Sequence, residues 1–223
     1  MILLTGFEPF DGAESNPSAE AAQLAAHQLM SEGTDAVAVV LPCTFGLAGR
    51  RLREAVEETS ANVVIAAGVA AERDRISLER VAVNRIDARI PDNAGAQPVD
   101  VPCVVDAPDE YPSTLPLDRI LARLELSGLP VELSDSAGRY VCNKAFFELM
   151  HHASAGEPRI AGFIHVPAEG TPYPAGADTE EAVSGAWTVG AMARALEIAA
   201  KASMHEARHP GDDMPVSSAS SGD

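Results

Sequence analysis

Asn62-Val-Val-Ile-Ala-Ala67 is apolar at every position after its asparagine. A strand with one face in water alternates apolar and polar residues, whereas an unbroken apolar run is typical of a strand buried on both faces. Residues 45–58 predict a helix just before this run, and residues 36–41 predict another apolar strand before that helix. Strand, helix and strand in this order favour a parallel sheet with helices on both faces.

The alternation of strands and helices continues outward from this unit. The other predicted strands cover residues 2–5, 130–133 and 159–167, and the other predicted helices cover residues 17–30, 117–127, 144–153 and 178–202, with Asp178 as the cap of the last one. Residues 76–93 suggest an irregular hairpin excursion, and the Pro-rich residues 98–116 an exposed loop. In parallel sheets, ligands bind outside the carboxyl ends of the strands, so a site is expected at that edge.

Composition limits the possible functions. The chain has 223 residues and 46% hydrophobic content, enough for one domain, which we expect to span residues 1–204. The polar residues 205–223 are expected to form a disordered tail. Sixteen Lys and Arg against 33 Asp and Glu give a formal charge of −17, which argues against nucleic-acid and membrane partners. The sequence contains no apolar run of about 18 residues, so no membrane span is predicted. Residues 1–5 are expected to form a strand and not a signal peptide.

The cysteines indicate a reducing compartment. The three cysteines are odd in number and show no CxxC spacing, which argues against a disulfide framework or a zinc site. We therefore expect a cytoplasmic protein without a metal or another cofactor. Cys43 and Cys103 have no nearby histidine in sequence and are expected to be inert.

Cys142 has a different setting from the other two cysteines. It lies where the loop 134–141 meets a predicted helix, and Gly138 can supply the turn between them. Unpaired N–H groups at a helix start favour a thiolate, which is the nucleophilic form of cysteine. A buried cysteine that only fills space is the alternative. His165 at the end of an apolar strand and Glu79 in an apolar segment are the candidate base and its orienting carboxylate.

Four segments then carry a resemblance to one family. Thr5-Gly-Phe7-Glu-Pro-Phe10-Asp-Gly with Asn16-Pro17, the segment 68–84 around Glu79, Ala137-Gly-Arg-Tyr-Val-Cys142-Asn143, and Gly162-Phe-Ile-His165-Val-Pro167 occur in the order found in the pyroglutamyl-peptidase I family of cysteine peptidases. The resemblance extends from residue 1 to about residue 200. It implies a three-layer α/β/α sandwich that assembles as a tetramer or a dimer. It also implies removal of an N-terminal pyroglutamyl residue from peptides by a Cys142–His165–Glu79 triad.

The resemblance also implies a set of substrate contacts. Phe7 and Phe10 match ring-packing phenylalanines, Asn16 a polar position in the same loop, and Tyr140 and Ile90 further walls of the pocket. For the two phenylalanines, ordinary core packing is the alternative. Arg89 is a candidate for supporting the oxyanion, with an ion pair to a flanking aspartate as its alternative.

One position departs from the family pattern. Val69 stands where many relatives carry a glutamine whose amide helps to hold the substrate, so weaker holding of the lactam is expected. Two other functions stay open from the sequence: a catalytically weak relative that binds modified peptide N-termini, and another Cys–His hydrolase of small amides.

Overall fold

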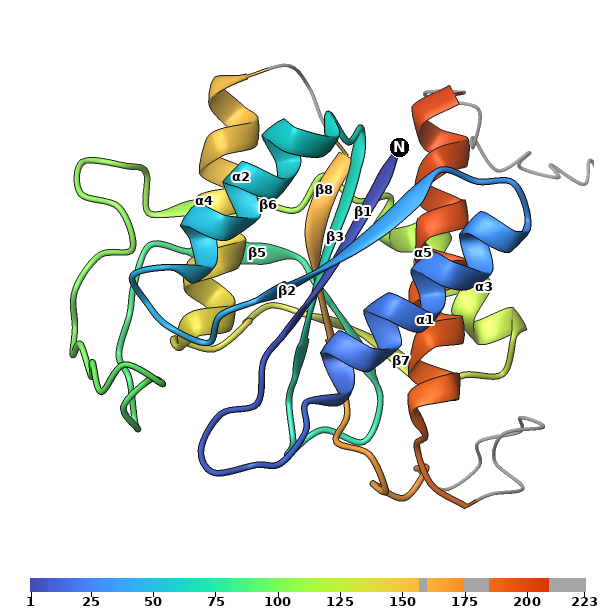
Figure 1. The fold of residues 1–223 in the computed structure, drawn as a ribbon, viewed down its shortest axis with the longest axis horizontal. Coiled ribbons are helices and arrows are strands. Elements are labelled where there is room, and N and C mark those ends of the chain that lie inside the picture. Colours follow the sequence, from blue (N-terminus) through green and yellow to red (C-terminus); the bar gives the residue numbers. More distant parts are fainter. Residues whose placement is uncertain (157–159, 175–184, 209–223) are drawn as a thin grey trace, which may run out of the picture.

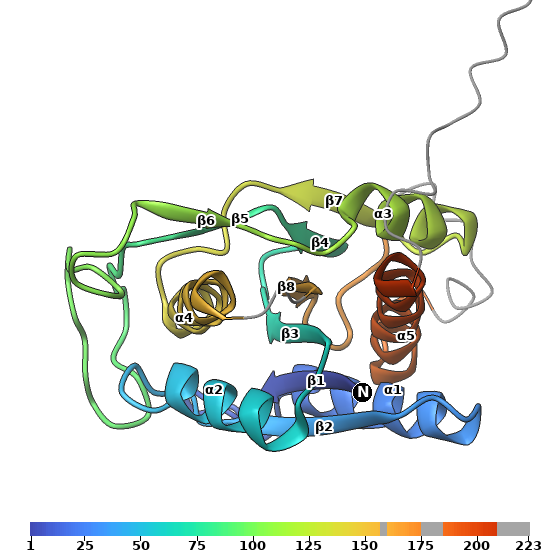
Figure 2. The ribbon, with the colours of Figure 1, turned by 90° about the horizontal axis from the view of Figure 1, so that it is seen from above.

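The protein, described by a computed structural model, is a three-layer α/β/α sandwich around a six-stranded sheet (Figures 1 and 2). The structure describes residues 1–156, 160–174 and 185–208. The strands are β1 (Ile2–Phe7), β2 (Ala36–Leu41), β3 (Val63–Val69), β4 (Ile76–Glu79), β5 (Val81–Val83), β6 (Glu110–Pro112), β7 (Val131–Ser134) and β8 (Ile160–Val166). The helices are α1 (Pro17–Ser31), α2 (Ala48–Thr59), α3 (Leu117–Leu126), α4 (Val141–Ala155) and α5 (Val189–Arg208).

The sheet has the strand order β2-β1-β3-β8-β4-β7. All neighbouring strands are parallel except β4 and β8, which pair antiparallel. The expected α/β sandwich with a mostly parallel sheet is therefore confirmed. Strand β3, the apolar run that predicted the sheet, lies near its middle, and six of its seven residues are buried.

Each face of the sheet has its own apolar core. Helices α1, α3 and α5 cover one face, and α2 and α4 cover the other (Figure 2). Because side chains alternate along a strand, Ile65 and Ala67 of β3 face the first core, whereas Val64 and Ala66 face the second. The face under α2 and α4 is the one that carries the candidate site.

Helix α1 illustrates how sequence sets an element. Asn16 accepts a hydrogen bond from the Ser18 amide as the N-cap, and Pro17 occupies the first helical position, where no N–H is needed. Gly6 of β1 lies so close to this helix start that a Cβ there would be 2.4 Å from backbone atoms of Ser18 and Ala19. The helix can therefore approach the strand only because residue 6 has no side chain.

The C-terminal part differs from the prediction. Helix α5 begins at Val189, where the Thr188 hydroxyl accepts from the Ala191 amide, and residues 185–188 are not helical. The predicted cap, Asp178, lies outside the described residues. The tail was expected from residue 205, but α5 includes residues 205–208, because the helix packs along α1 and α3. Residues 209–223 lie outside the described residues, and the prediction for them stays a prediction.

Two further segments were predicted incompletely. The predicted helix at residues 45–58 begins only at Ala48, and residues 45–47 form a turn. The expected loop 98–116 contains strand β6, which pairs antiparallel with β5 beside α4, and it buries Cys103 and Leu115. Pairing between strands about 30 positions apart cannot be read from local pattern alone.

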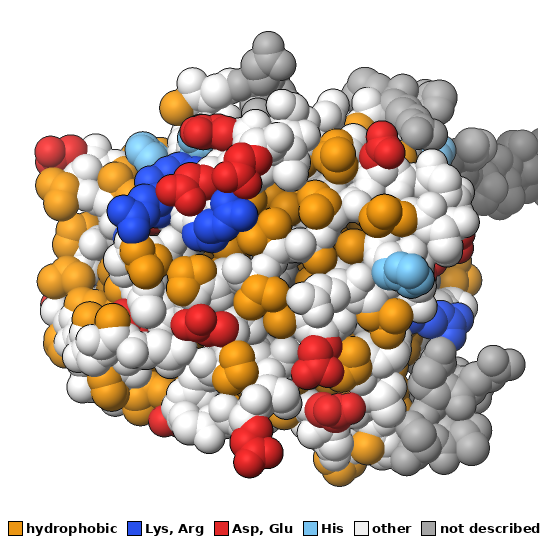
Figure 3. All heavy atoms as spheres, in the orientation of Figure 1, with side chains coloured by type: hydrophobic (Ala, Val, Ile, Leu, Met, Phe, Trp, Pro, Cys, Tyr) orange, Lys and Arg blue, Asp and Glu red, His pale blue; other side chains and the backbone are white. Residues whose placement is uncertain are grey.

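The surface mixes charges of both signs over α2. Arg51 pairs with Glu54 and Glu58 at 3.9 and 3.1 Å, and Figure 3 shows basic and acidic side chains side by side on this face. Among the described helices, none is long and apolar enough to cross a membrane.

Candidate active site

Cys142 is the second residue of α4 and is half-buried. The residue before the helix, Tyr140, has extended backbone and no side chain caps the helix start. Gly138 turns the preceding loop with a φ of +75°, a conformation that favours glycine. Because the N-cap side chain does not accept from the first turn, N–H groups there can stabilise a developing oxyanion near the thiol.

Gly68 makes room for the thiol. A Cβ at this position would be 2.9 Å from the Cys142 Sγ and 2.9 Å from the Phe163 ring. Gly68 is the register partner of His165 across β3 and β8. Adjacent strands lie about 4.8 Å apart, so the thiol packs against Gly68, which is the neighbour of His165 on the next strand.

His165 and Glu79 form a buried pair. The Nδ1 of His165 lies 2.7 Å from Oε1 of Glu79, and the two residues are 5% and 0% exposed. In the neutral ring, Nδ1 carries the proton and donates a hydrogen bond to the carboxylate, so Nε2 carries the free lone pair. Across β4 and β8, His165 pairs with Ser77 and Glu79 pairs with Phe163. Phe163 belongs to the core under α2 and α4, and side chains two positions apart on a strand share a face, so Glu79 and His165 both lie on this face. Glu79 and His165 thus contact each other on the face of the sheet where Gly68 admits the Cys142 thiol.

Electrostatics give Glu79 its charged form. Burial by itself raises the pKa of the Glu79 carboxyl, but the hydrogen bond and charge of His165, the nearby Ser134 hydroxyl and the Arg73 guanidinium outweigh it and leave the pKa below its ordinary value. A carboxylate is therefore present beside the imidazole at neutral pH.

The thiol is not acidified by the helix start, contrary to the expectation from sequence. Burial raises the pKa of the Cys142 thiol well above its ordinary value, and the nearby Cys43 and Glu79 raise it further. A hydrogen bond from the Cys142 backbone amide lowers this pKa but is outweighed. Cys142 is therefore a neutral thiol at rest, and it needs a base to become a nucleophile.

An aromatic cluster surrounds Tyr140, two residues before Cys142. The Tyr140 ring contacts Phe10 at a centroid distance of 6.0 Å and Phe45 edge-on at 5.2 Å, and its hydroxyl donates to the Pro91 carbonyl at 2.9 Å. Phe10 and Tyr140 are only partly buried. Ile90, also partly buried, precedes the proline in the same segment. The structure thus brings Phe10 and Tyr140 into contact and ties Tyr140 to the segment that carries Ile90.

Other predicted contacts have structural roles. Phe7 is buried and packs against Phe163 at 6.4 Å, which supports the core-packing alternative for this ring. Asn16 uses its amide to donate to the Glu8 carbonyl and to accept from both the amide and the hydroxyl of Ser18. Val69 packs against the core under α1 and α5, on the opposite face of the sheet from Cys142.

Arg89 is exposed, and its predicted alternative is not observed. Of the flanking aspartates, Asp87 pairs with Arg139 at 3.7 Å, and Asp92 accepts from the amides of Phe45, Ala94 and Ala96. Neither carboxylate forms an ion pair with Arg89 within the described part of the chain.

The other two cysteines are buried free thiols. Burial raises the pKa of Cys43 to about 12 and that of Cys103 to about 11, so both are protonated at neutral pH. Within the ranges that the structure describes, no group of three His, Cys, Asp or Glu side chains has the arrangement of a metal site.

Comparison with known proteins identifies the family of the chain. Residues 1–206 match the family model described as pyroglutamyl peptidase. The chain belongs to that family. It is 47% identical over 166 residues to the pyrrolidone-carboxylate peptidase of Gloeobacter violaceus, covering 74% of this chain and 80% of that protein. The enzyme of the same name from Pyrococcus furiosus is 43% identical over 175 residues, with coverage of 74% and 80%.

Solved structures show the same fold. Pyroglutamyl peptidase I of Bacillus amyloliquefaciens superposes with a TM-score of 0.78 at 34% identity, covering 92% of this chain and 96% of that one. A mutant pyrrolidone carboxyl peptidase of P. furiosus gives a TM-score of 0.78 at 35% identity, with coverage of 92% and 98%. The chain is therefore an enzyme, a cysteine peptidase of this family.

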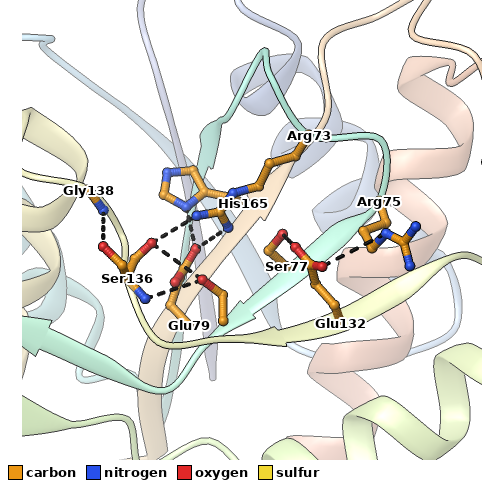
Figure 4. A network of polar contacts seen from close by, with 9 residues as sticks. Arg73, Arg75, Ser77, Glu79, Glu132, Ser136, Gly138 and His165 are labelled. Atoms are coloured by element: carbon orange, nitrogen blue, oxygen red, sulfur yellow. Dashed lines mark hydrogen bonds and ion pairs between the residues drawn. The ribbon is translucent and has the colours of Figure 1, made fainter.

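Sequence reasoning missed the residues that hold the site in place. Arg73 donates to Oε1 of Glu79 at 2.7 Å and to the Ser136 carbonyl at 2.8 Å (Figure 4). Glu8 accepts at Oε1 from the Cys43 amide and from the Asn93 side chain, tying the loop around Asn93 to the end of β1. The available signal was position: Arg73 and Glu8 lie within the segments that carry the family resemblance.

Proposed function

We propose that the protein removes an N-terminal pyroglutamyl residue from peptides by acyl transfer through Cys142. The observation that carries the proposal is the 2.7 Å contact of His165 with Glu79, on the sheet face where Gly68 admits the Cys142 thiol. The family to which the chain belongs and the names of its relatives supply the substrate class.

In the first half of the reaction, a carbon–sulfur bond forms and the carbon–nitrogen bond of the amide breaks. His165 Nε2 takes the thiol proton as the Cys142 sulfur attacks the amide carbonyl carbon. The resulting oxyanion is stabilised by amides at the start of α4. Arg89 is proposed to add positive charge, because the Tyr140 hydroxyl binds the Pro91 carbonyl of the same segment. The imidazolium then protonates the leaving amine as the carbon–nitrogen bond breaks. A pyroglutamyl thioester remains on Cys142.

In the second half, water replaces the amine. His165 removes a proton from water, which attacks the thioester, and the thiol leaves with that proton. Glu79 keeps the imidazole in one tautomer and stabilises its charged form in both halves. Because burial keeps the Cys142 thiol protonated, this base is needed at each turnover.

The partly buried cluster of Phe10, Tyr140 and Ile90 is proposed to receive the lactam ring. A small neutral ring suits an apolar wall with few polar groups. Phe7 and Asn16 are proposed to support this wall from behind, through the Phe7 contact with Phe163 and the Asn16 bond to the Glu8 carbonyl. The expected homo-oligomer, dimer or tetramer, is also a proposal, to be tested by light scattering.

The decisive test compares three fluorogenic amides. The wild type is expected to hydrolyse a pyroglutamyl amide and to leave alanyl and prolyl amides intact. Cys142→Ser and His165→Ala should fall to near background, and Glu79→Gln should retain more activity than either. Because the residues act as a unit, Cys142→Ser/His165→Ala should be scarcely worse than Cys142→Ser alone. Cys103→Ser is the matched control and should keep full activity.

The outcomes separate the alternatives. Cleavage of all three amides would indicate a different small-amide hydrolase. Tight binding of a pyroglutamyl peptide without turnover would indicate a weak relative that acts as a binding protein. Iodoacetamide should inactivate the enzyme by modifying Cys142 before Cys43 and Cys103. Inactivation through either of those two would contradict the assignment of the nucleophile.

A further inference from the structure

Arg73 connects two parts of the candidate site that come from distant segments. It lies in the turn between β3 and β4, and its side chain is 21% exposed, whereas the Glu79 carboxylate it reaches is fully buried. One guanidinium nitrogen, Nη1, lies 2.7 Å from Oε1 of Glu79. The other, Nη2, donates to the Ser136 carbonyl at 2.8 Å.

The first contact concerns the carboxylate of the His–Glu pair. Oε1 of Glu79 accepts from both Arg73 and His165, and Oε2 has no hydrogen-bond partner in the part of the chain that the structure describes. Two donors on one oxygen fix the rotation of the carboxylate. A buried carboxylate that lost its cationic partner would gain a proton more easily.

The second contact concerns the loop that leads to the nucleophile. Ser136 lies between β7 and α4, and its hydroxyl accepts from the Gly138 amide at 3.2 Å (Figure 4). Its own amide donates to the Ser134 hydroxyl at 3.3 Å. The carbonyl that Arg73 holds therefore belongs to a short chain of bonds that ends at the turn before Cys142.

The turn that carries Arg73 is itself held in place. The Arg73 amide donates to the Ala70 carbonyl at 3.0 Å, and the indole N–H of the buried Trp187 donates to the Asp74 carbonyl at 2.7 Å. The guanidinium thus extends from an anchored backbone, and its two bonds can transmit that position to Glu79 and to Ser136.

We propose that Arg73 is a positioning residue for the reaction: it holds Glu79 charged and oriented toward His165, and it fixes the loop that presents Cys142. The inference rests on the proposed function for its reaction. The groups that face Glu79 are His165 from β8, Arg73 from the β3–β4 turn, the Ser134 hydroxyl from β7 and the Cys142 thiol near the start of α4. Among these described groups, Arg73 is the one permanent cation.

The test uses variants that separate charge from geometry. Arg73→Met removes both, and Arg73→Lys keeps the charge but offers one ammonium in place of a two-armed guanidinium. Arg75→Met is the matched control, since Arg75 lies on the same segment and pairs with Asp74 and Glu132 but not with Glu79. Each variant is assayed for kcat and KM on a pyroglutamyl amide from acidic to neutral pH, and for Tm.

Arg73→Met should lower kcat by about 10- to 100-fold, the cost of a nucleophile misplaced by up to about 1 Å. The acidic limb of its profile of kcat against pH should move to higher pH by about one unit, because loss of a nearby cation raises the pKa of the Glu79 carboxyl. Arg73→Lys should leave the limb close to that of the wild type while kcat falls. Arg75→Met should change neither quantity.

Two results would overturn the proposal. One is an Arg73→Met enzyme whose acidic limb stays in place while activity follows Tm alone, as a purely structural residue would behave. The other is an Arg73→Lys enzyme whose limb shifts as far as that of Arg73→Met. If Arg73→Met does not fold, Arg73→Gln supplies the same comparison, since it removes the charge and keeps a hydrogen-bond donor.

A measurement without substrate distinguishes this inference from the proposed function. The pH dependence of Cys142 alkylation by iodoacetamide, followed by mass spectrometry, reports the same Glu79–His165 pair. If the wild type fails to cleave pyroglutamyl amides but Arg73→Met still shifts the alkylation profile, the proposed function is wrong and the role of Arg73 stands. If cleavage occurs and neither profile shifts, the role of Arg73 is wrong.

Discussion

Gly68→Ala adds a single methyl group at the point where the sheet meets the nucleophile. The new Cβ would lie 2.9 Å from the Cys142 Sγ and 2.9 Å from the Phe163 Cζ, with a further ring carbon at 3.2 Å. Gly68 lies in the regular strand β3 and does not have a positive φ, so alanine fits the backbone itself. The substitution therefore tests the contact with Cys142 and not a strained conformation.

The size of the effect follows from these distances. Ordinary contacts between such atoms are about 3.5–4.0 Å, so the thiol and the ring must retreat by roughly 0.6–1 Å. Overpacking of this kind costs about 1–3 kcal/mol of unfolding free energy, which corresponds to a fall in Tm of roughly 2–12 °C for a chain of this size. A displacement of about 1 Å at a reacting atom lowers kcat/KM by about 100-fold.

The assay combines turnover, alkylation and thermal unfolding. Gly68→Ala should lose far more activity on a pyroglutamyl amide than its Tm accounts for, and its alkylation by iodoacetamide should slow in parallel. Gly46→Ala is the control, because no atom lies within 4 Å of its added Cβ. A Gly68→Ala enzyme with wild-type kcat/KM would show that Cys142 does not react from the position beside β3, and the reasoning would fail.

Three further predictions concern other parts of the molecule. Val69→Gln should leave KM for a pyroglutamyl amide unchanged and lower Tm, because the side chain packs on the core under α1 and α5; a lower KM would place it in the pocket instead. Glu79→Gln should make the free energy of unfolding depend less on pH in the acidic range. The pKa of Glu79 is lowered on folding, so the stabilisation by its carboxylate is present above the unfolded value of about 4.3 and is lost as pH falls through the folded value. Urea unfolding at several pH values measures this, and parallel curves for variant and wild type would contradict it. A chain ending at Arg208 should keep its activity and Tm, since the residues beyond it have little apolar surface to bury; a loss of several degrees would show that they pack on the domain.

The sequence predicted the main layers because they depend on local signals. The apolar run of β3, the proline and asparagine at the start of α1, and Gly138 before Cys142 each act within a few residues. Cys142 and His165 were expected on one edge because both lie at or just after predicted strand ends, where parallel sheets bind ligands. Glu79 was added as the carboxylate of an apolar segment and from the family resemblance, and it lies on β4, which runs antiparallel to β8.

Features that depend on non-local partners were missed. The antiparallel entry of β4 between β7 and β8 requires pairing with strands far along the chain. The ionisation of Cys142 was predicted with the wrong sign, since the depth of burial that decides it is a property of the folded core. The predicted start of helix α5 was too early because Asp178 resembles a cap. Ala186 instead forms a bridge with Pro172, and the Trp187 amide donates to the Thr171 carbonyl, so these residues are not helical.

Trp187 can serve as an intrinsic fluorescence probe of the turn between β3 and β4. It is the sole tryptophan of the chain, it is fully buried, and its indole donates to the Asp74 carbonyl next to Arg73. Indole emission is sensitive to the polarity around the ring and to its hydrogen bond. Release of the turn between β3 and β4 would therefore shift the emission to longer wavelength. Stopped-flow fluorescence can thus follow this turn in real time, with no added dye and no second tryptophan to subtract.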